Sequence, residues 1–242
     1  MSGHSKWSNI KHRKEKSDAE KGKLFSRIGK ELVMATKQGG PDPESNIKLK
    51  DVIAKAKAAN MPNESILRTI KKAAGDMNLD NYEEIYYEGY GPGGVAIIVE
   101  AMTDNRNRTA GDIRHYFDRF GGNLGQTGCV SFLFEKKGVI LIERTEDIDV
   151  ETLMTVAINY GAEDFNVQDE YFEILTAPAD FSTVRENLEN NGYHFISAGI
   201  EMVPQTTIKL DNPKDEEMLT KLIDNLEDMD DIQNVYYNWD RE

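Results

Sequence analysis

Basic side chains are concentrated at the start of the chain in a pattern that suits phosphate binding. The first 30 residues hold nine Lys and Arg against three Asp and Glu. Trp7 lies among these cations, and an exposed indole can stack on a base while lysine and arginine neutralise phosphates. The alternative is a solvated basic face. We favour a nucleic-acid-binding segment that contacts its ligand through Lys6, Trp7, Lys11, His12, Arg13, Lys14, Lys16, Lys21, Lys23, Arg27 and Lys30.

Charge is distributed unevenly along the whole chain. Residues 1–75 contain 17 Lys and Arg against 8 Asp and Glu, which gives +9, and the remaining residues contain 12 against 35, which gives −23. Together these make the net charge of −14. Because the Debye length is about 8 Å at physiological salt, a basic domain can hold a polyanion while acidic domains lie farther away. The asymmetry indicates a basic binding region attached to acidic domains.

Three glycine- or arginine-rich segments invite a functional interpretation. The first, GYGPGG at 89–94, formally matches the dinucleotide fingerprint, but a strand follows it where that site needs a helix, so a turn is favoured. The second, TDNRNRT at 103–109, can bind an anion at a helix start, although simple capping is favoured. The third, GGNLGQTG at 121–128, is either a contact loop or only a turn.

Residues for catalysis or metal binding do not form a recognisable constellation. The four histidines are scattered, and Cys129 is the single cysteine, so neither a zinc motif nor an internal disulfide is expected. No nucleophile motif is found, and we expect no enzyme activity and no cofactor. The sequence has no run of 18 apolar residues and no secretory signal, so we expect no membrane contact and a cytoplasmic location.

Three helices are expected before residue 76. Residues 1–16 carry too few apolar side chains to fold alone. Ser17 and Glu20 form a capping box that starts the first helix. Helical spacing of apolar residues then continues to the glycines at 39–40 and recurs at 45–59 and 63–74. In the second helix Ile47, and in the third Ile66, Leu67 and Ile70, are expected to face inward.

After residue 76 the apolar periodicity changes to that of strands alternating with helices. Residues 136–203 have the order β-α-β-β-α-β, which is the ferredoxin-like pattern. A second such unit is expected from 77–135 with 204–242, and its strands include CVSFLFE at 129–135 and TTIKL at 206–210. The predicted class is α+β, with an amino-terminal three-helix domain, 1–76, followed by two ferredoxin-like α/β domains, one inserted in the other.

Five segments closely resemble one known family, and the resemblance covers nearly the whole chain. These segments are GHSKWSNIKHRK, DAEKGKLFSRIGKEL, KAKAANMPNESILRTIKKA, YEGYGPGGVAIIVE and GGNLGQTGCVSFLFE, and the family is YebC/PmpR. The resemblance implies a helical domain and two α/β domains. It also implies a probable transcriptional regulatory role, while relatives that include the mitochondrial translational activator of cytochrome oxidase act on translation. By the resemblance, the family's basic leader corresponds to Lys6, Trp7, Lys11, Arg13 and Lys14, and the basic residues of its first helix to Lys21, Lys23 and Arg27. Glu20 stands where the family commonly has a basic residue, which removes one positive charge from the first helix.

The sequence thus leads to a nucleic-acid-binding regulator of gene expression, with DNA and transcription as the first hypothesis. The alternative is a ribosome-associated translation factor that relieves stalling, since the basic arm offers phosphate contacts and stacking but no obvious base-reading helix. The expected partner is therefore DNA, or ribosomal RNA and the ribosome. The acidic domains are candidates for binding basic proteins such as ribosomal proteins.

Overall fold

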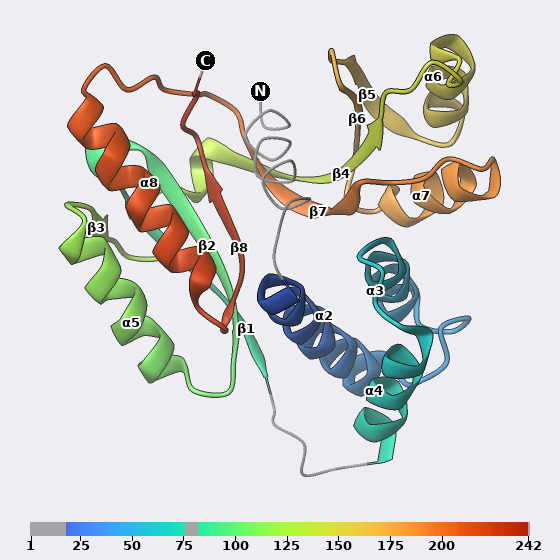
Figure 1. Cartoon of the computed structure of the whole chain (residues 1–242), viewed down its shortest axis with the longest axis horizontal. Coiled ribbons are helices and arrows are strands. Elements are labelled where there is room, and N and C mark those ends of the chain that lie inside the picture. Colours follow the sequence, from blue (N-terminus) through green and yellow to red (C-terminus); the bar gives the residue numbers. More distant parts are fainter. Residues whose placement is uncertain (1–17, 76–81, 242) are drawn as a thin grey trace. The chain divides into compact units, whose positions relative to one another are not determined.

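The computed structural model describes residues 18–75 and 82–241 of the chain (Figure 1). These residues form two compact units. The first contains the start of the first described helix up to Lys30, together with 82–135 and 202–241. The second contains 31–75 and 136–201. The predicted α+β class, with amino-terminal helices before two sheets of four antiparallel strands, is confirmed.

The amino-terminal helices are α2 (Asp18–Gly39), α3 (Ile47–Ala58) and α4 (Asn63–Gly75). Buried Asn46 caps α3 by accepting a hydrogen bond from the Leu49 N–H at 3.0 Å. Its side-chain amide donates to the Ala35 carbonyl at 2.9 Å and to the Gly40 carbonyl at 2.8 Å. One asparagine therefore satisfies backbone groups at the end of α2 and at the start of α3, which fixes the turn between them.

The first unit is built on a sheet with strand order β3-β1-β2-β8. Two helices, α5 and α8, lie side by side on one face of the sheet (Figure 1). Buried side chains such as Ile97, Val99, Phe117 and Leu222 fill the layer between them. The elements are β1 (Glu83–Tyr90), β2 (Ala96–Thr103), α5 (Arg106–Arg119), β3 (Asn123–Leu124), α8 (Pro213–Asp228) and β8 (Ile232–Tyr237).

The second unit contains a sheet with strand order β5-β6-β4-β7. Its chain order of β-α-β-β-α-β and this strand order together make the predicted ferredoxin-like unit. Ile140, Phe172 and Leu188 belong to its buried core. The elements are β4 (Phe134–Glu143), α6 (Val150–Asn159), β5 (Ala162–Val167), β6 (Tyr171–Thr176), α7 (Phe181–Asn190) and β7 (Ser197–Pro204).

Two predicted strands of the first unit are wrong. Residues 131–133 of CVSFLFE form the short 3-10 helix η2 (Ser131–Leu133). The Val130 and Ser131 N–H groups donate to the Glu88 carboxylate, so they are not available for hydrogen bonds to a neighbouring strand. The short β3 takes the place at the sheet edge beside β1. In TTIKL only Ile208 makes a bridge, to Trp239.

Some predicted inward positions on the helices are also wrong. Ile47 and Leu67 are 64% and 67% exposed, whereas Ile66, Ile70 and Ala73 of α4 are buried. The buried face of α4 is thus narrower than the spacing of its apolar residues predicts, because Leu67 lies outside it. The predicted domain boundaries stay a prediction, since the two compact units divide the chain differently.

An ion pair joins α3 to α7 within the second unit. Arg185 is only 2% exposed, and its Nε lies 3.0 Å from Asp51 Oδ1. Asp51 also accepts a hydrogen bond of 2.6 Å from the Ser182 hydroxyl, and Arg185 Nη1 lies 2.8 Å from Glu189 Oε2. Because a guanidinium this deeply buried needs a partner, Asp51 matters for the stability of the unit.

We expect Asp51→Ala to lower the free energy of unfolding by about 3 kcal/mol, since it leaves a buried charge with only the solvent-accessible Glu186 and Glu189 as partners. The measurement is urea unfolding followed by circular dichroism. Glu146→Ala, at an exposed loop position, is the matched control and should change stability by less than about 0.5 kcal/mol. Equal stability of the two variants would contradict the role of the pair.

Candidate nucleic-acid interface

The residues predicted to bind nucleic acid divide into two groups. Lys6, Trp7, Lys11, His12, Arg13, Lys14 and Lys16 lie outside the described residues. The other four, Lys21, Lys23, Arg27 and Lys30, are carried by α2. Lys21 is exposed near the start of that helix. The remaining three recur at spacings of four and three residues, which places them on one face of the helix.

This face of α2 contacts the acidic segment that ends α8 and leads into β8, within the first unit. Lys23 Nζ lies 2.9 Å from Asp228 Oδ1. Arg27 donates a hydrogen bond to the Glu227 carbonyl. Lys30 Nζ lies 2.9 Å from Asp231 Oδ1 and donates to the Asp230 carbonyl at 3.0 Å. These three cations therefore bind oxygen atoms of the protein itself.

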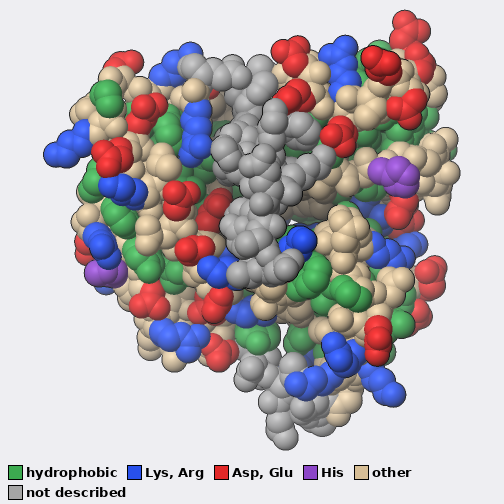
Figure 2. Space-filling view, in the orientation of Figure 1, with side chains coloured by type: hydrophobic (Ala, Val, Ile, Leu, Met, Phe, Trp, Pro, Cys, Tyr) green, Lys and Arg blue, Asp and Glu red, His purple; other side chains and the backbone are tan. Residues whose placement is uncertain are grey.

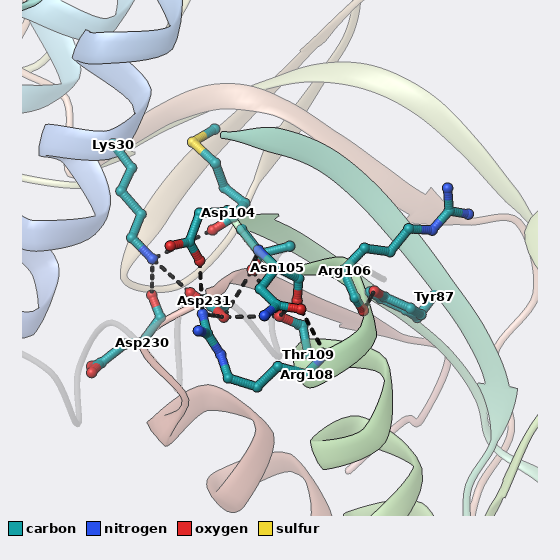
Figure 3. A network of polar contacts seen from close by, with 11 residues as sticks. Lys30, Tyr87, Asp104, Asn105, Arg106, Arg108, Thr109, Asp230 and Asp231 are labelled. Carbon is teal, nitrogen blue, oxygen red and sulfur yellow. Dashed lines mark hydrogen bonds and ion pairs between the residues drawn. The ribbon is translucent and has the colours of Figure 1, made fainter. Parts of the chain in front are cut away.

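Asp231 collects donors from three elements (Figure 3). Besides the ion pair with Lys30 on α2, its Oδ2 accepts hydrogen bonds from the Thr109 hydroxyl at 2.8 Å and from the Thr103 hydroxyl at 3.1 Å. Arg108 Nη2 lies 3.2 Å from the same oxygen. Burial of the carboxyl would raise the pKa of Asp231, but the donors, led by Lys30 and Thr109, outweigh it and lower the pKa to about 2. Asp231 is therefore a carboxylate at any physiological pH.

The arginine-rich start of α5 is occupied by local contacts. The Asn105 side chain caps the helix by accepting from the Arg108 N–H at 3.1 Å. The Arg108 guanidinium pairs with Asp104 at 2.8 Å as well as with Asp231. This agrees with the favoured interpretation of TDNRNRT as a capping segment.

The loop at 121–128 is held in place by Glu88. This residue is 5% exposed, and its carboxylate accepts hydrogen bonds from the N–H groups of Gly128, Val130 and Ser131 at 2.8–2.9 Å. Burial would raise the pKa of Glu88, but the three backbone donors lower it below its ordinary value. Gly125 fits closely, since a Cβ there would lie 2.5 Å from the Cys129 Sγ. The Glu88 carboxylate thus fixes the end of the loop, while residues 125–128 of the loop are exposed.

The segment at 89–94 forms a hairpin turn between β1 and β2. The Gly91 N–H donates to the Val95 carbonyl at 2.7 Å, and Gly93 and Gly94 have φ of 68° and 78°. Positive φ explains glycine at these two positions. Since β2 and not a helix follows, the turn lacks the helix terminus that binds a dinucleotide phosphate.

Other kinds of site were sought within the described part of the chain. Among residues 18–75 and 82–241, no group of three or more His, Cys, Asp or Glu side chains is placed to hold a metal ion. No helix in these ranges has the length and apolar character needed to cross a membrane.

Asp231 and Glu88 were missed by the sequence-based search. Their partners lie 40 or more residues away along the chain, so no local spacing reveals them. A weak signal exists in both cases. Glu88 is a charged residue between Tyr87 and a glycine in a tyrosine-rich strand, and Asp231 ends the acidic stretch EDMDD at 227–231, where a helix ends.

Comparisons with known proteins cover almost the whole chain. Residues 5–76 match the family model described as the TACO1/YebC protein N-terminal domain, and residues 82–239 match the TACO1/YebC second and third domain. A probable transcriptional regulatory protein of Acetivibrio thermocellus is 68% identical over 239 residues, 99% of each chain. Another of that description, from Caldicellulosiruptor saccharolyticus, is 60% identical over all 242 residues, which is the full length of both chains.

A solved structure is also similar. The crystal structure of a conserved hypothetical protein, Aq1575, from Aquifex aeolicus has a TM-score of 0.84 and 45% sequence identity. The similarity covers 93% of this chain and 92% of that one.

The lowered pKa of Asp231 predicts a pH-dependent contribution to stability. Because the folded pKa is about 2 and the ordinary value is 3.8, the contribution is present above about pH 4 and is lost as the pH falls towards 2. The difference corresponds to about 2 kcal/mol. We expect Asp231→Asn to lose this stability at pH 7 and to differ little from the parent at pH 2, as measured by urea unfolding at several pH values.

Asp112→Asn on the exposed face of α5 is the control, and its stability should follow the parent protein across the same pH range. A constant difference between Asp231→Asn and the parent from pH 7 to pH 2 would contradict the assignment.

Proposed function

Because this chain belongs to the TACO1/YebC family, we propose that it is a nucleic-acid-binding regulator of gene expression, and more specifically a DNA-binding transcriptional regulatory protein. Support comes first from relatives with 60–68% identity that carry the description probable transcriptional regulatory protein. The role needs no catalytic group and no cofactor. It places the protein in the cytoplasm with its nucleic acid.

The observation that carries the proposal is the segregation of charge. Residues 1–75 carry +9 and the rest of the chain −23. A uniformly acidic protein would repel a polyanion, whereas a segregated one can bind it through its basic part. Neutralising phosphates also releases counterions, which drives the binding of nucleic acid at moderate salt.

The contacts of α2 divide the proposed binding residues by role. Lys23, Arg27 and Lys30 bind the acidic segment 227–231, so a phosphate would have to displace these acceptors to reach them. Lys23 is the more accessible of the two ion-paired lysines on this face of α2, because its side chain is 42% exposed against 16% for Lys30. We assign the main contacts to the arm that carries Lys6, Trp7, Lys11, His12, Arg13, Lys14 and Lys16, with a supporting role for α2.

The acidic parts of the chain are proposed to keep the nucleic acid on the basic region. Asp and Glu exceed Lys and Arg by 23 after residue 75, which disfavours a polyanion there. The same charge suits basic protein partners. Ribosomal RNA and the ribosome are the alternative target, and they would be bound through the same phosphate contacts.

Binding of a labelled DNA duplex, measured by fluorescence anisotropy, should depend strongly on salt. With ~6 phosphates neutralised, the slope of log K against log salt should be roughly −5. Exchange of Lys6, Lys11, Arg13 and Lys14 for Gln should reduce the size of this slope by about 3 to 4, at about 0.9 per lost contact.

A matched control exchanges four exposed cations of the rest of the chain for Gln, so that the net charge changes equally: Arg114, Lys136, Lys209 and Lys214. This control should keep the parent slope. If the intact protein binds neither duplex DNA nor RNA at physiological salt, the proposed function is wrong. Migration with ribosomes in a sucrose gradient at low salt, together with preference for RNA over duplex DNA, would favour the translational alternative.

A further inference from the structure

The exposed face of α4 carries cations that form no ion pair with the residues that the structure describes. Arg68, Lys71 and Lys72 are all exposed on this helix, and Leu67 lies beside them. Lys and Arg side chains gather over α4 in the space-filling view (Figure 2). We call these four residues the cationic face of α4.

Several other lysines of the second unit are bound to carboxylates. Lys50 pairs with Glu186 at 3.1 Å, Lys55 with Glu31 at 2.7 Å, and Lys137 with Glu163 at 2.7 Å. Within the described ranges, by contrast, Lys71 and Lys72 make no ion pair or hydrogen bond, and Arg68 reaches only the Ser65 hydroxyl at 3.5 Å. Within residues 18–75 and 82–241, this face therefore has no carboxylate partner.

Helix stability explains only part of this arrangement. Lysines near the carboxyl end of a helix interact favourably with the helix dipole, by about 0.3–1 kcal/mol each. That effect does not account for Leu67, which is 67% exposed at the edge of the face although its neighbour Ile66 is buried. An exposed leucine at the edge of a group of cations fits a surface that is covered by a partner with both negative charge and apolar area.

We propose that the cationic face of α4 is a second contact surface for the nucleic acid. The inference rests on the proposed function and extends the contacts beyond residues 6–30. Arg68 and Lys72 are four positions apart, which is about 6 Å along the helix. This spacing brings neighbouring phosphates of one strand within reach of their long side chains, and Leu67 contacts a sugar or the apolar edge of a base. Lys71 lies between the two on the same exposed arc.

The test uses the full-length protein and compares two variants of equal charge. K71Q/K72Q removes two cations of the α4 face, and K209Q/K214Q removes two exposed lysines elsewhere. With fluorescein-labelled duplex DNA, K71Q/K72Q should reduce the size of the salt slope by about 2, because each phosphate contact contributes about 0.9. Raising the salt from 50 to 200 mM lowers the affinity of both proteins, and the factor by which it falls should be about 10 times smaller for K71Q/K72Q than for the parent. K209Q/K214Q should keep the parent slope.

A second measurement tests proximity directly and does not depend on affinity. A photo-crosslinking phenylalanine derivative in place of Leu67 should attach the labelled duplex on irradiation. The same group in place of Ile158, which is 54% exposed on α6, should not. Circular dichroism melting of each variant checks that it is folded, and little change is expected because all of these positions are exposed.

The outcomes separate this inference from the proposed function. If the parent binds the duplex in an arm-dependent manner while K71Q/K72Q and K209Q/K214Q behave alike and Leu67 gives no crosslink, the α4 surface is refuted and the function stands. If the parent binds no nucleic acid, both fall. Crosslinking from position 67 to an acidic protein in cells, without nucleic acid, would also overturn the assignment.

Discussion

The structure of the first unit depends on the hydrogen bonds and ion pairs made by one largely shielded carboxylate, that of Asp231. Asp231 has a side chain only 14% exposed, and an unpaired charge at such a position would be costly. Its donors come from α2, from the end of β2 and from α5, so the same interaction that neutralises Asp231 also fixes these three elements against each other. Lys30 is thereby committed to the fold, and it cannot be counted as a freely available cation.

This constraint determines which positive charges remain for a ligand. The acidic run 227–231 occupies the face of α2 that a linear count of charges assigns to phosphate. Carboxylates of the second unit likewise occupy Lys50, Lys55 and Arg185. The number of Lys and Arg residues in a basic segment is therefore an upper limit on the number available to a ligand, because each internal ion pair occupies one of them. In the described chain, α4 carries three exposed cations that remain unpaired with described carboxylates within two turns of one helix.

The sequence predicted features that depend on local order and missed those that depend on distant partners. Helical periodicity and capping residues located α2 to α8 closely, and the order of elements in 136–203 was sufficient for a ferredoxin-like sheet. CVSFLFE has the composition of a strand, yet Glu88, more than 40 residues earlier, binds its N–H groups and forces a turn. Leu67 was misplaced because periodicity shows that a side is apolar without showing what covers it.

Ion pairs that stabilise the fold also differ from exposed cations in how strongly salt screens them. The Lys30–Asp231 pair is largely shielded from solvent, so added salt screens it weakly, whereas Lys71 and Lys72 lie in water, where salt screens them strongly. Raising the ionic strength should therefore weaken attraction at the exposed cations while leaving the first unit folded. If the proposed nucleic-acid contacts are made mainly by exposed cations, a protein of net charge −14 would release a polyanion at raised salt while the shielded Lys30–Asp231 pair keeps the first unit folded.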